Sequence, residues 1–171
     1  MTQSVLWAPW RIDYILGSKE KKGTPENPGS CPFCHLPHEQ QNRDNLILKR
    51  TRYSFVMLNR YPYSSGHLLV LPLAHCADLK ELEREPYLDL MLLLKESIQK
   101  LQLAMQPAGI NAGLNLGKAA GAGIADHLHF HIVPRWPGDH NFMPVIADTM
   151  VLPQHLDAAY DMLKPYFDRS L

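Results

Sequence analysis

The chain has 171 residues, of which 46% are hydrophobic and 20% are charged, and its formal net charge is zero. These values are typical of one soluble globular domain, and they exclude an overall basic field that would attract DNA or RNA. The apolar runs are far shorter than the about 18 residues of a membrane-spanning helix, and the N-terminus lacks the pattern of a signal peptide. We therefore expect a cytoplasmic protein that binds neither nucleic acid nor membrane.

An aromatic-rich stretch at 6–15 is followed by a segment rich in lysine, glycine and proline at 17–30. An exposed apolar patch is costly, so we expect the aromatic stretch to dock on the domain or on a partner chain. The second segment is typical of a flexible linker. Residues 1–30 are therefore predicted to precede the main domain, which we place at 31–145, with a helical extension of the same domain at 146–171.

The body of the chain contains short apolar runs that are bounded by charged residues, glycine or proline, as β-strands are. The predicted strands are 45–49, 53–58, 67–72, 109–116 and 127–134. The first two are separated by charged residues, as in a hairpin.

One long helix is predicted before the fourth strand, because apolar residues recur there at steps of three and four. These residues are Tyr87, Met91, Leu94, Ile98, Leu101 and Met105. Pro86 suits the first helical turn and Pro107 the end. Shorter helices are predicted near 78–84, with Asp78 as the N-cap, and between 153 and 166. Strands in hairpins with helices packed on them predict an α+β fold: a five-stranded antiparallel sheet with one long helix and shorter helices.

Three of the nine histidines lie within five residues, as His127, His129 and His131. Alternate side chains of a strand point to opposite faces, so the three imidazoles share one face while Leu128 and Phe130 enter the core. Three interpretations are open: a solvated face of an edge strand, a three-histidine zinc site, or a nucleophile that attacks phosphorus. Histidine suits the last, because a neutral imidazole is nucleophilic near pH 7.

The segment just before this strand, 115–126, is rich in glycine and alanine and contains one lysine. Small residues let backbone N–H groups approach a phosphate closely, although a flexible turn is the alternative. Because the loop leads directly into the histidines, we interpret it as a phosphate cradle beside a nucleophile. The residues expected to form it are Gly117, Lys118, Gly121, Ala122 and Gly123.

Asn115-x-Gly117, the small-residue loop and His127-Leu-His-Phe-His-Ile-Val-Pro134-Arg together resemble the histidine triad (HIT) family. Upstream, Leu58-Asn59-Arg-Tyr-Pro62-Tyr-Ser-Ser-Gly66-His67 resembles the first half of that family, in which an asparagine precedes a Gly-His strand. The resemblance covers residues 30–145. The segments 6–11 and 136–142 resemble the branch that includes diadenosine tetraphosphate phosphorylases and related hydrolases.

The resemblance implies that His129 is the nucleophile, held in its reactive tautomer by a backbone carbonyl, and that His131 binds the attacked phosphate. It implies that His67 supports the triad from the neighbouring strand. Asn59 would contact the ribose and Asn115 a phosphate. The resemblance also implies a homodimer in which two sheets join edge to edge.

The chain departs from the family pattern in one place. Many members have a glutamine or serine in the loop before the triad, where it touches the scissile phosphate and the leaving group, whereas this chain has Ala122 and Gly123. Backbone amides or Lys118 would have to substitute. The leaving-group preference and the choice between hydrolysis and phosphorolysis therefore stay open.

Cys31 and Cys34 form a C-x-x-C pair, a spacing that suits a metal ion or a redox couple. With Cys76 the cysteine count is odd, which argues against a disulfide framework. Candidates for further metal ligands are His35, His38, His75, Cys76 and His127. By resemblance to some HIT members and to galactose-1-phosphate uridylyltransferases, a structural zinc would be bound by Cys31, Cys34, His75 and His127. The alternative is a reduced pair of partly buried thiols.

These features favour an enzyme, a nucleotidyl hydrolase or transferase. In this hypothesis His129 attacks the α-phosphate of a dinucleoside polyphosphate, such as diadenosine tetraphosphate, or of a related nucleotide. Water or inorganic phosphate then releases the nucleotide from the covalent nucleotidyl-histidine. The alternatives are a non-catalytic nucleotide-binding sensor and a metal-dependent hydrolase that uses the three histidines.

Overall fold

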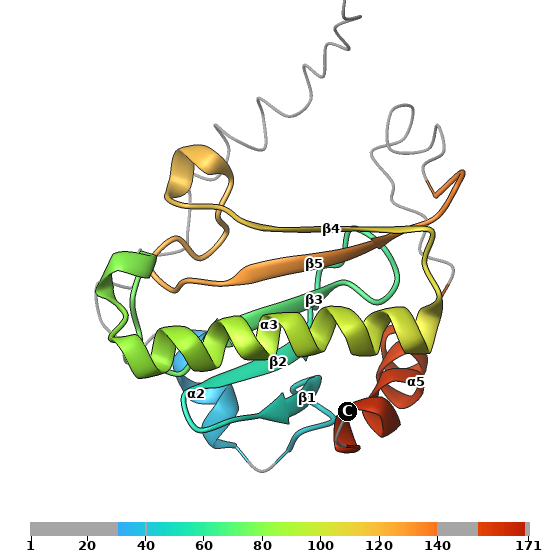
Figure 1. Ribbon diagram of the computed structural model, residues 1–171, viewed down its shortest axis with the longest axis horizontal. Helices are drawn as coiled ribbons and strands as arrows, with labels where there is room; N and C mark the ends of the chain where they lie inside the picture. The colour runs from blue at the N-terminus through green and yellow to red at the C-terminus, as the bar shows by residue number, and fades with distance from the viewer. Residues whose placement is uncertain (1–30, 40, 140–153, 170–171) are drawn as a thin grey trace, which may run out of the picture.

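The computed structural model describes residues 31–39, 41–139 and 154–169 of the protein, and Figure 1 shows how their elements are arranged. The aromatic stretch and linker expected at 1–30 lie outside these residues. Helices pack on a five-stranded antiparallel sheet, which confirms the predicted α+β fold. Among the described helices, none has both the length and the apolar character needed to cross a membrane.

The strands of the sheet follow the order β1-β2-β3-β5-β4, and all neighbouring pairs are antiparallel. They are β1 (Ile47–Arg50), β2 (Ser54–Leu58), β3 (Leu68–Pro72), β4 (Gly109–Leu114) and β5 (Phe130–Arg135). The spatial order departs from the chain order at β5, which lies between β3 and β4. This arrangement brings the histidine-rich segment beside the strand that follows His67.

β1 and β5 begin more than one residue later than the sequence predicts, and each shift has a local reason. β1 begins at Ile47, because Leu46 has a φ of 59°, outside the β region. β5 begins at Phe130, because the amide of Leu128 donates to the carbonyl of Cys76 instead of to the sheet. The first part of the histidine segment is therefore bonded to the loop that follows β3.

The long helix α3 (Arg84–Met105) lies across one face of the sheet (Figure 1). It ends where Gln106 adopts the left-handed conformation, with Pro107 next in the chain. Its buried stripe consists of Leu90, Leu93, Leu94, Ser97, Lys100 and Leu101. Tyr87 was expected on that stripe but is exposed in the first turns of the helix.

The shorter elements differ in part from the prediction. The helix expected at 78–84 is a single 3₁₀ turn, η3 (Leu79–Glu81), in which Asp78 accepts a hydrogen bond from the amide of Lys80. The C-terminal helix is present as α5 (Leu156–Asp168). The sequence did not predict α2 (Pro32–His35) and η2 (Leu36–His38), which are too short to show a periodic pattern.

The interior strands β2 and β3 are buried on both faces, which explains why their sequences are nearly continuous apolar runs. In β2, Val56 and Leu58 pack in the core under α3, whereas Phe55 and Met57 point to the opposite face. That opposite face is covered by the turn of α2, which contributes Phe33 to its core. The histidine side chains lie on this second face.

The buried ammonium group of Lys100 links the helix α5 to α3. Lys100 is 1% exposed, and its Nζ donates to the carbonyls of Tyr166 and Arg169 at 2.9 and 2.6 Å. The same Nζ lies 2.8 Å from the carboxylate of Glu96, which also pairs with Lys49 on β1. A buried ammonium is costly unless it is paired and hydrogen-bonded, and here it is both. These bonds join the C-terminal helix to the body of the domain.

Candidate active site

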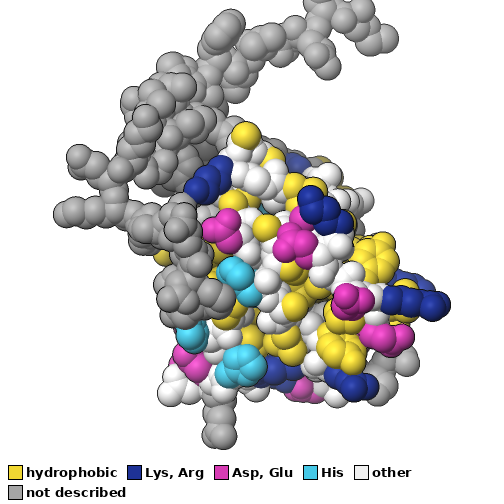
Figure 2. Space-filling model, turned by 90° about the vertical axis from the view of Figure 1, so that its left-hand side faces the viewer, with side chains coloured by type: hydrophobic (Ala, Val, Ile, Leu, Met, Phe, Trp, Pro, Cys, Tyr) yellow, Lys and Arg dark blue, Asp and Glu magenta, His cyan; other side chains and the backbone are white. Residues whose placement is uncertain are grey.

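Pairing of β3 with β5 brings together histidines that are far apart in the sequence. His131 lies opposite Leu69 in the sheet, and His67 immediately precedes β3. His67, His127 and His129 are buried. Figure 2 shows histidine side chains that reach the surface on one face of the molecule, and the burial of single residues gives His35 and His38 as exposed. The described structure therefore separates a buried histidine group from the exposed ones.

The turn before His67 depends on Gly66. Its φ is 79°, a left-handed conformation that residues with a Cβ rarely adopt, and a Cβ at this position would collide with the Sδ of Met105. The amide of His67 donates to Ser64, and its carbonyl accepts from the amide of Asn59. The turn thus holds His67 at a fixed place at the start of β3.

The tautomer of His129 is set by the backbone. Its Nδ1 lies 2.8 Å from the carbonyl oxygen of His127, and a carbonyl can only accept, so Nδ1 carries the proton. The lone pair of the neutral ring is therefore on Nε2. Burial lowers the pKa of His129, although the bond to His127 opposes this shift, so the ring is neutral near pH 7. Neutral imidazole with a free Nε2 is a nucleophile.

His67 and His131 form a second hydrogen-bonded pair. The amide of Tyr63 donates to Nδ1 of His67 at 3.0 Å, so this nitrogen is an acceptor and Nε2 carries the proton. Nε2 of His67 lies 2.9 Å from Nδ1 of His131, which must then accept. It follows that Nε2 of His131 carries a proton. That atom is buried and has no hydrogen-bond partner among the described residues.

Both rings of this pair are neutral. Burial, followed by the nearby His131 and His129, lowers the pKa of His67 to about 3. Burial, followed by His129, lowers the pKa of His131 to about 4. An additional proton on either acceptor nitrogen would face another N–H group, which agrees with these low values. His131 therefore offers a neutral N–H donor with an unfilled hydrogen bond.

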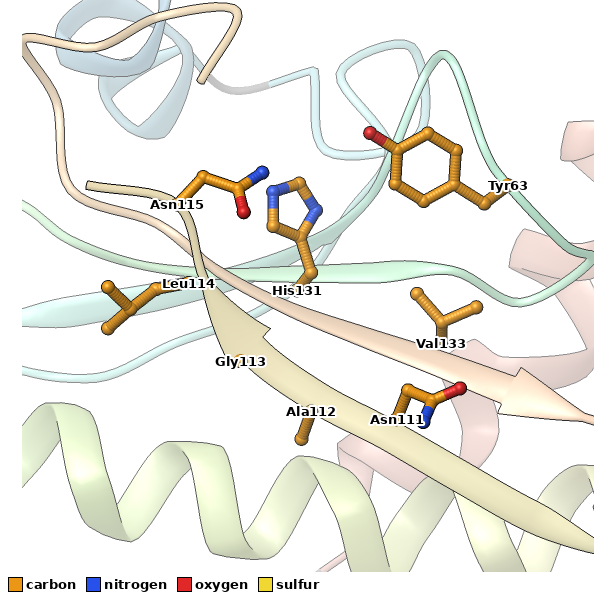
Figure 3. Close-up of a pocket in the computed structure, with 8 residues that line it drawn as sticks. All are labelled: Tyr63, Asn111, Ala112, Gly113, Leu114, Asn115, His131 and Val133. Carbon is orange, nitrogen blue, oxygen red and sulfur yellow. The ribbon is translucent and has the colours of Figure 1, made fainter. Parts of the chain in front are cut away.

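A pocket of about 240 Å³ lies beside His131. It is lined by Tyr63, Asn111, Ala112, Gly113, Leu114, Asn115, His131 and Val133. Figure 3 shows the Asn115 amide next to the His131 ring, with Tyr63 on the other side of that ring. An amide and an imidazole N–H that face one small space can together bind an anion such as a phosphate oxygen.

Other residues that the sequence singled out lie outside this pocket lining. Gly117 and Lys118 are exposed, and the latter begins a short turn, η4 (Lys118–Ala120). Gly121 and Gly123 are also exposed, and Ala122 is half-buried. The Asn59 amide is engaged within the chain, because its Nδ2 lies 3.3 Å from Nδ1 of His67 and its Oδ1 accepts from the amide of Tyr61.

A second cluster adjoins the histidines and has the composition of a metal site. The ligand atoms of Cys31, Cys34, His75 and His127 all lie within 4.8 Å of one another. Among the described residues, this is the group of cysteine, histidine and acidic side chains that could hold an ion. His35 and His38 are exposed outside it, and Cys76 is in the core under α3.

The distances in this cluster fit a tetrahedral zinc ion. Zn–S bonds of about 2.3 Å and Zn–N bonds of about 2.0 Å place tetrahedral ligand atoms about 3.5 Å apart. The Sγ of Cys34 lies 3.2 Å from Nδ1 of His75 and 3.6 Å from Nδ1 of His127. The Sγ of Cys31 lies 3.4 Å from the same His127 nitrogen. The donor set and its spacing therefore suit a closed structural site.

His127 is oriented for this role by its other ring nitrogen. Its Nε2 donates to the carbonyl of Pro72 at 2.9 Å, which leaves Nδ1 unprotonated and facing the cysteines. Burial lowers the pKa of His127 to about 4 even though the bond to Pro72 opposes the shift. Burial and the neighbouring Cys31 raise the pKa of the Cys34 thiol to about 11, so metal binding would release a proton there.

Two aromatic residues of the site were not recognised in the sequence. The ring of Phe33 lies 5.6 Å from that of His127 and 5.5 Å from that of His129. The ring of Tyr63 stacks on His67 at 5.0 Å. In the sequence only their positions point to the site: Phe33 lies between the two cysteines, and Tyr63 lies shortly before Gly-His.

A HIT domain model matches residues 39–138 of the chain. The chain belongs to the HIT domain family. A relative from Mycobacterium tuberculosis named AP-4-A phosphorylase is 36% identical over 152 residues, which cover 88% of this chain and 77% of that protein. Adenosine 5'-monophosphoramidase hnt1 from Schizosaccharomyces pombe is 35% identical over 106 residues, or 62% of this HIT protein and 74% of that one.

Solved structures of HIT proteins support the fold. A Zn-bound histidine triad family protein from Mycobacterium smegmatis superposes on this HIT protein with a TM-score of 0.64. The identity is 21%, and the alignment covers 83% of this chain and 96% of that one. This likeness shows that the two proteins share the same fold.

Proposed function

We propose that this HIT protein cleaves a dinucleoside polyphosphate, such as diadenosine tetraphosphate, at the α-phosphate through a covalent nucleotidyl-His129 intermediate. The observation that carries the proposal is the bond between Nδ1 of His129 and the carbonyl of His127, which leaves Nε2 as the free nucleophile. The identity with the protein named AP-4-A phosphorylase supports this substrate class.

In the first step the lone pair on Nε2 of His129 attacks the α-phosphorus. The bond from phosphorus to the bridging oxygen breaks, and its electron pair leaves with the remaining polyphosphate. The attack makes the imidazole cationic, and the carbonyl of His127 stabilises that charge through the Nδ1 proton. In the second step water or inorganic phosphate attacks the α-phosphorus, and the N–P electron pair returns to His129.

We assign the unfilled N–H of His131 to a non-bridging oxygen of the attacked phosphate. The Asn115 amide, which lies on the same pocket, would bind the phosphate as well. His67 would act as a positioning residue, because it fixes which nitrogen of His131 carries the proton. We retain Asn59 for the ribose, because its Nδ2 has a second N–H and its Oδ1 a second lone pair besides the contacts with His67 and Tyr61.

Further phosphates would contact the small-residue loop. Its exposed backbone amides and the exposed Lys118 are available to a polyphosphate chain that extends beyond His131. The residues assigned to this contact are Gly117, Lys118, Gly121, Ala122 and Gly123.

We propose a structural zinc at Cys31, Cys34, His75 and His127, on the strength of the ligand spacing and of the Zn-bound relative. When bound, the ion would supply a fixed positive charge that holds the thiolates and joins the α2 turn to the histidine segment. The three-histidine metal hydrolase is disfavoured. His127 faces the cysteines, His129 bonds to a backbone carbonyl and His131 bonds to His67, so the three rings do not converge on one ion.

We also propose a homodimer that forms at β4. This strand is an edge of the sheet, and its residues Asn111, Ala112 and Gly113 are exposed. An edge-to-edge pair would cover its free backbone groups. We place 31–145 and 146–171 in one domain, because α5 packs on α3 and β1. Free thiols in a metal-like cluster favour a reducing compartment, the cytoplasm.

Turnover of diadenosine tetraphosphate, measured with and without inorganic phosphate, tests this function. AMP plus ATP as products identifies water as the acceptor, and ADP plus ATP identifies phosphate. A nucleotide sensor would bind the substrate and release neither pair. Adenosine 5'-monophosphoramidate as a parallel substrate shows whether an amine leaving group is preferred.

A further inference from the structure

The aromatic ring of Tyr63 is held in an unusual place for a half-exposed side chain. It is 54% exposed, yet it stacks on His67 at 5.0 Å with an interplanar angle of 28° and faces His131 at 6.1 Å. Its backbone amide also donates to His67. The loop and the ring contacts together fix the direction of the side chain, so the position of its hydroxyl is set in advance of any ligand.

The hydroxyl of Tyr63 is available to a ligand. In Figure 3 it lies at the end of the ring that faces the space over His131, opposite Asn115. The hydrogen bonds of this residue within the described structure are made by its backbone, and the phenolic oxygen has no partner there. The same pocket also borders the unfilled N–H of His131. Two unused donors therefore meet at one cavity.

The reaction proposed above creates a need for a second donor. When the bond at the α-phosphate breaks, the leaving polyphosphate gains negative charge, and a positioned hydrogen-bond donor stabilises it. The loop amides and Lys118 are assigned above to phosphates further along the chain and lie outside the pocket lining, and Ala122 and Gly123 have no polar side chain. His131 is already assigned to the attacked phosphate. Tyr63 is the remaining side chain of the lining that has an O–H donor.

We propose that Tyr63 is a specificity-determining residue whose hydroxyl donates a hydrogen bond to a phosphate oxygen of the leaving group. The proposal rests on the function proposed above and extends it. It predicts that the enzyme prefers leaving groups that carry a phosphate next to the scissile bond over leaving groups that do not. The ring, through its stacking on His67, places the hydroxyl, and the hydroxyl selects the substrate.

The test compares Tyr63→Phe with the wild-type protein on two substrates. Diadenosine tetraphosphate has a phosphate leaving group, whereas the 4-nitrophenyl ester of AMP releases 4-nitrophenolate. A hydrogen bond to a charged group contributes about 1.5–3 kcal/mol, so kcat/KM for the tetraphosphate should fall about 10-fold or more. The value for the nitrophenyl ester should stay within about 2-fold, since that leaving group makes no such contact.

Tyr61→Phe is the matched control, because Tyr61 lies on the same loop but is 81% exposed. It should match the wild type on both substrates. An equal loss on both substrates in Tyr63→Phe would mean that the residue only supports the histidines. No loss on either substrate would mean that the hydroxyl makes no contact. Each of these results overturns the proposal.

A binding measurement separates this proposal from the proposed function. Calorimetric titration with ATP and with AMP requires no turnover. Tyr63→Phe should lower the affinity for ATP about 10-fold and leave that for AMP unchanged, because only ATP has phosphates beyond the first. If the wild type turned over neither substrate, the enzymatic function would fail, and the ATP and AMP affinities would still decide the role of Tyr63. If Tyr63→Phe bound ATP as tightly as the wild type does, the role proposed for Tyr63 would be overturned.

Discussion

The carbonyl oxygen of His127 lies 2.8 Å from Nδ1 of His129, while Nδ1 of His127 itself lies among the cysteine sulfurs. One residue thus belongs to the candidate metal cluster through its side chain and orients the proposed nucleophile through its backbone. Phe33, between the two cysteines, touches both rings. The metal cluster and the proposed reaction centre are therefore mechanically connected.

This connection predicts the effect of removing a metal ligand. Cys34→Ala should lower the zinc content from one ion per chain to nearly none, because three ligands bind the ion much less tightly than four. It should also lower the thermal midpoint and broaden the His129 resonances. Metal analysis, thermal unfolding and 15N NMR of histidine-labelled protein measure the three effects. Cys76→Ala, which removes a buried thiol outside the cluster, should keep its zinc. Full zinc content in Cys34→Ala would exclude the assigned ligand set.

The neutral His67–His131 pair predicts a dependence of stability on pH. The pKa of each ring is about 3 or 4 in the folded protein because burial disfavours the charged form, whereas an unfolded histidine titrates near 6.5. The unfolded state therefore binds more protons below about pH 6.5. The stabilisation is complete above that pH and is lost as the pH falls toward the folded values.

Urea unfolding at pH 7 and at pH 5 measures this effect. The free energy of unfolding should be lower at pH 5, and His67→Gln should reduce the difference between the two pH values. His38→Gln changes an exposed histidine and should leave the difference as it is. In 15N spectra both rings of the wild-type pair should keep their neutral tautomers at pH 5. Cationic rings at that pH would contradict the hydrogen-bond assignment.

The buried ammonium of Lys100 predicts a large stability loss on substitution. Lys100→Met would leave the carbonyls at the end of α5 without their donor and remove one partner of Glu96. Loss of one partner from a buried charged network costs about 3 kcal/mol. Chemical unfolding measures the change, and Lys95→Met, at an exposed position on the same helix, should change the stability by less than about 0.5 kcal/mol. If both variants changed the stability by a similar small amount, the stabilising role of Lys100 would be contradicted.

Much of the fold could be predicted from the sequence, because its core elements have clear periodic patterns. β2, β3 and α3 lie close to their predicted positions, since both strands are apolar on two faces and the helix repeats at steps of three and four. Local conformations could not be predicted in this way. The left-handed φ of Leu46 and the bond from Leu128 to Cys76 shift strand ends without any periodic signal.

The histidines and the metal cluster of the candidate site could be predicted from the sequence, whereas its aromatic residues could not. The alternation at 127–131 indicates a shared face, and the resemblance to the HIT family suggested the four-residue metal cluster that the structure brings together. The roles of Tyr63 and Phe33 depend on contacts between segments that are distant in the chain or in a turn, so no local pattern indicates them. The hydrogen-bond sequence from Tyr63 through His67 to His131 likewise becomes visible only once the strands are paired.

The central claim is that His129 becomes covalently bonded to the α-phosphorus. Its most direct test is quenching of the protein with alkaline detergent, at high concentration, within one turnover of diadenosine tetraphosphate labelled in the α-phosphates. The account predicts labelled wild-type protein, a label that is stable to base and labile to acid on warming, and no label on His129→Asn. His38→Gln should be labelled like the wild type. Equal labelling of His129→Asn, or product release by the wild type with no labelled protein at any time, would contradict the account.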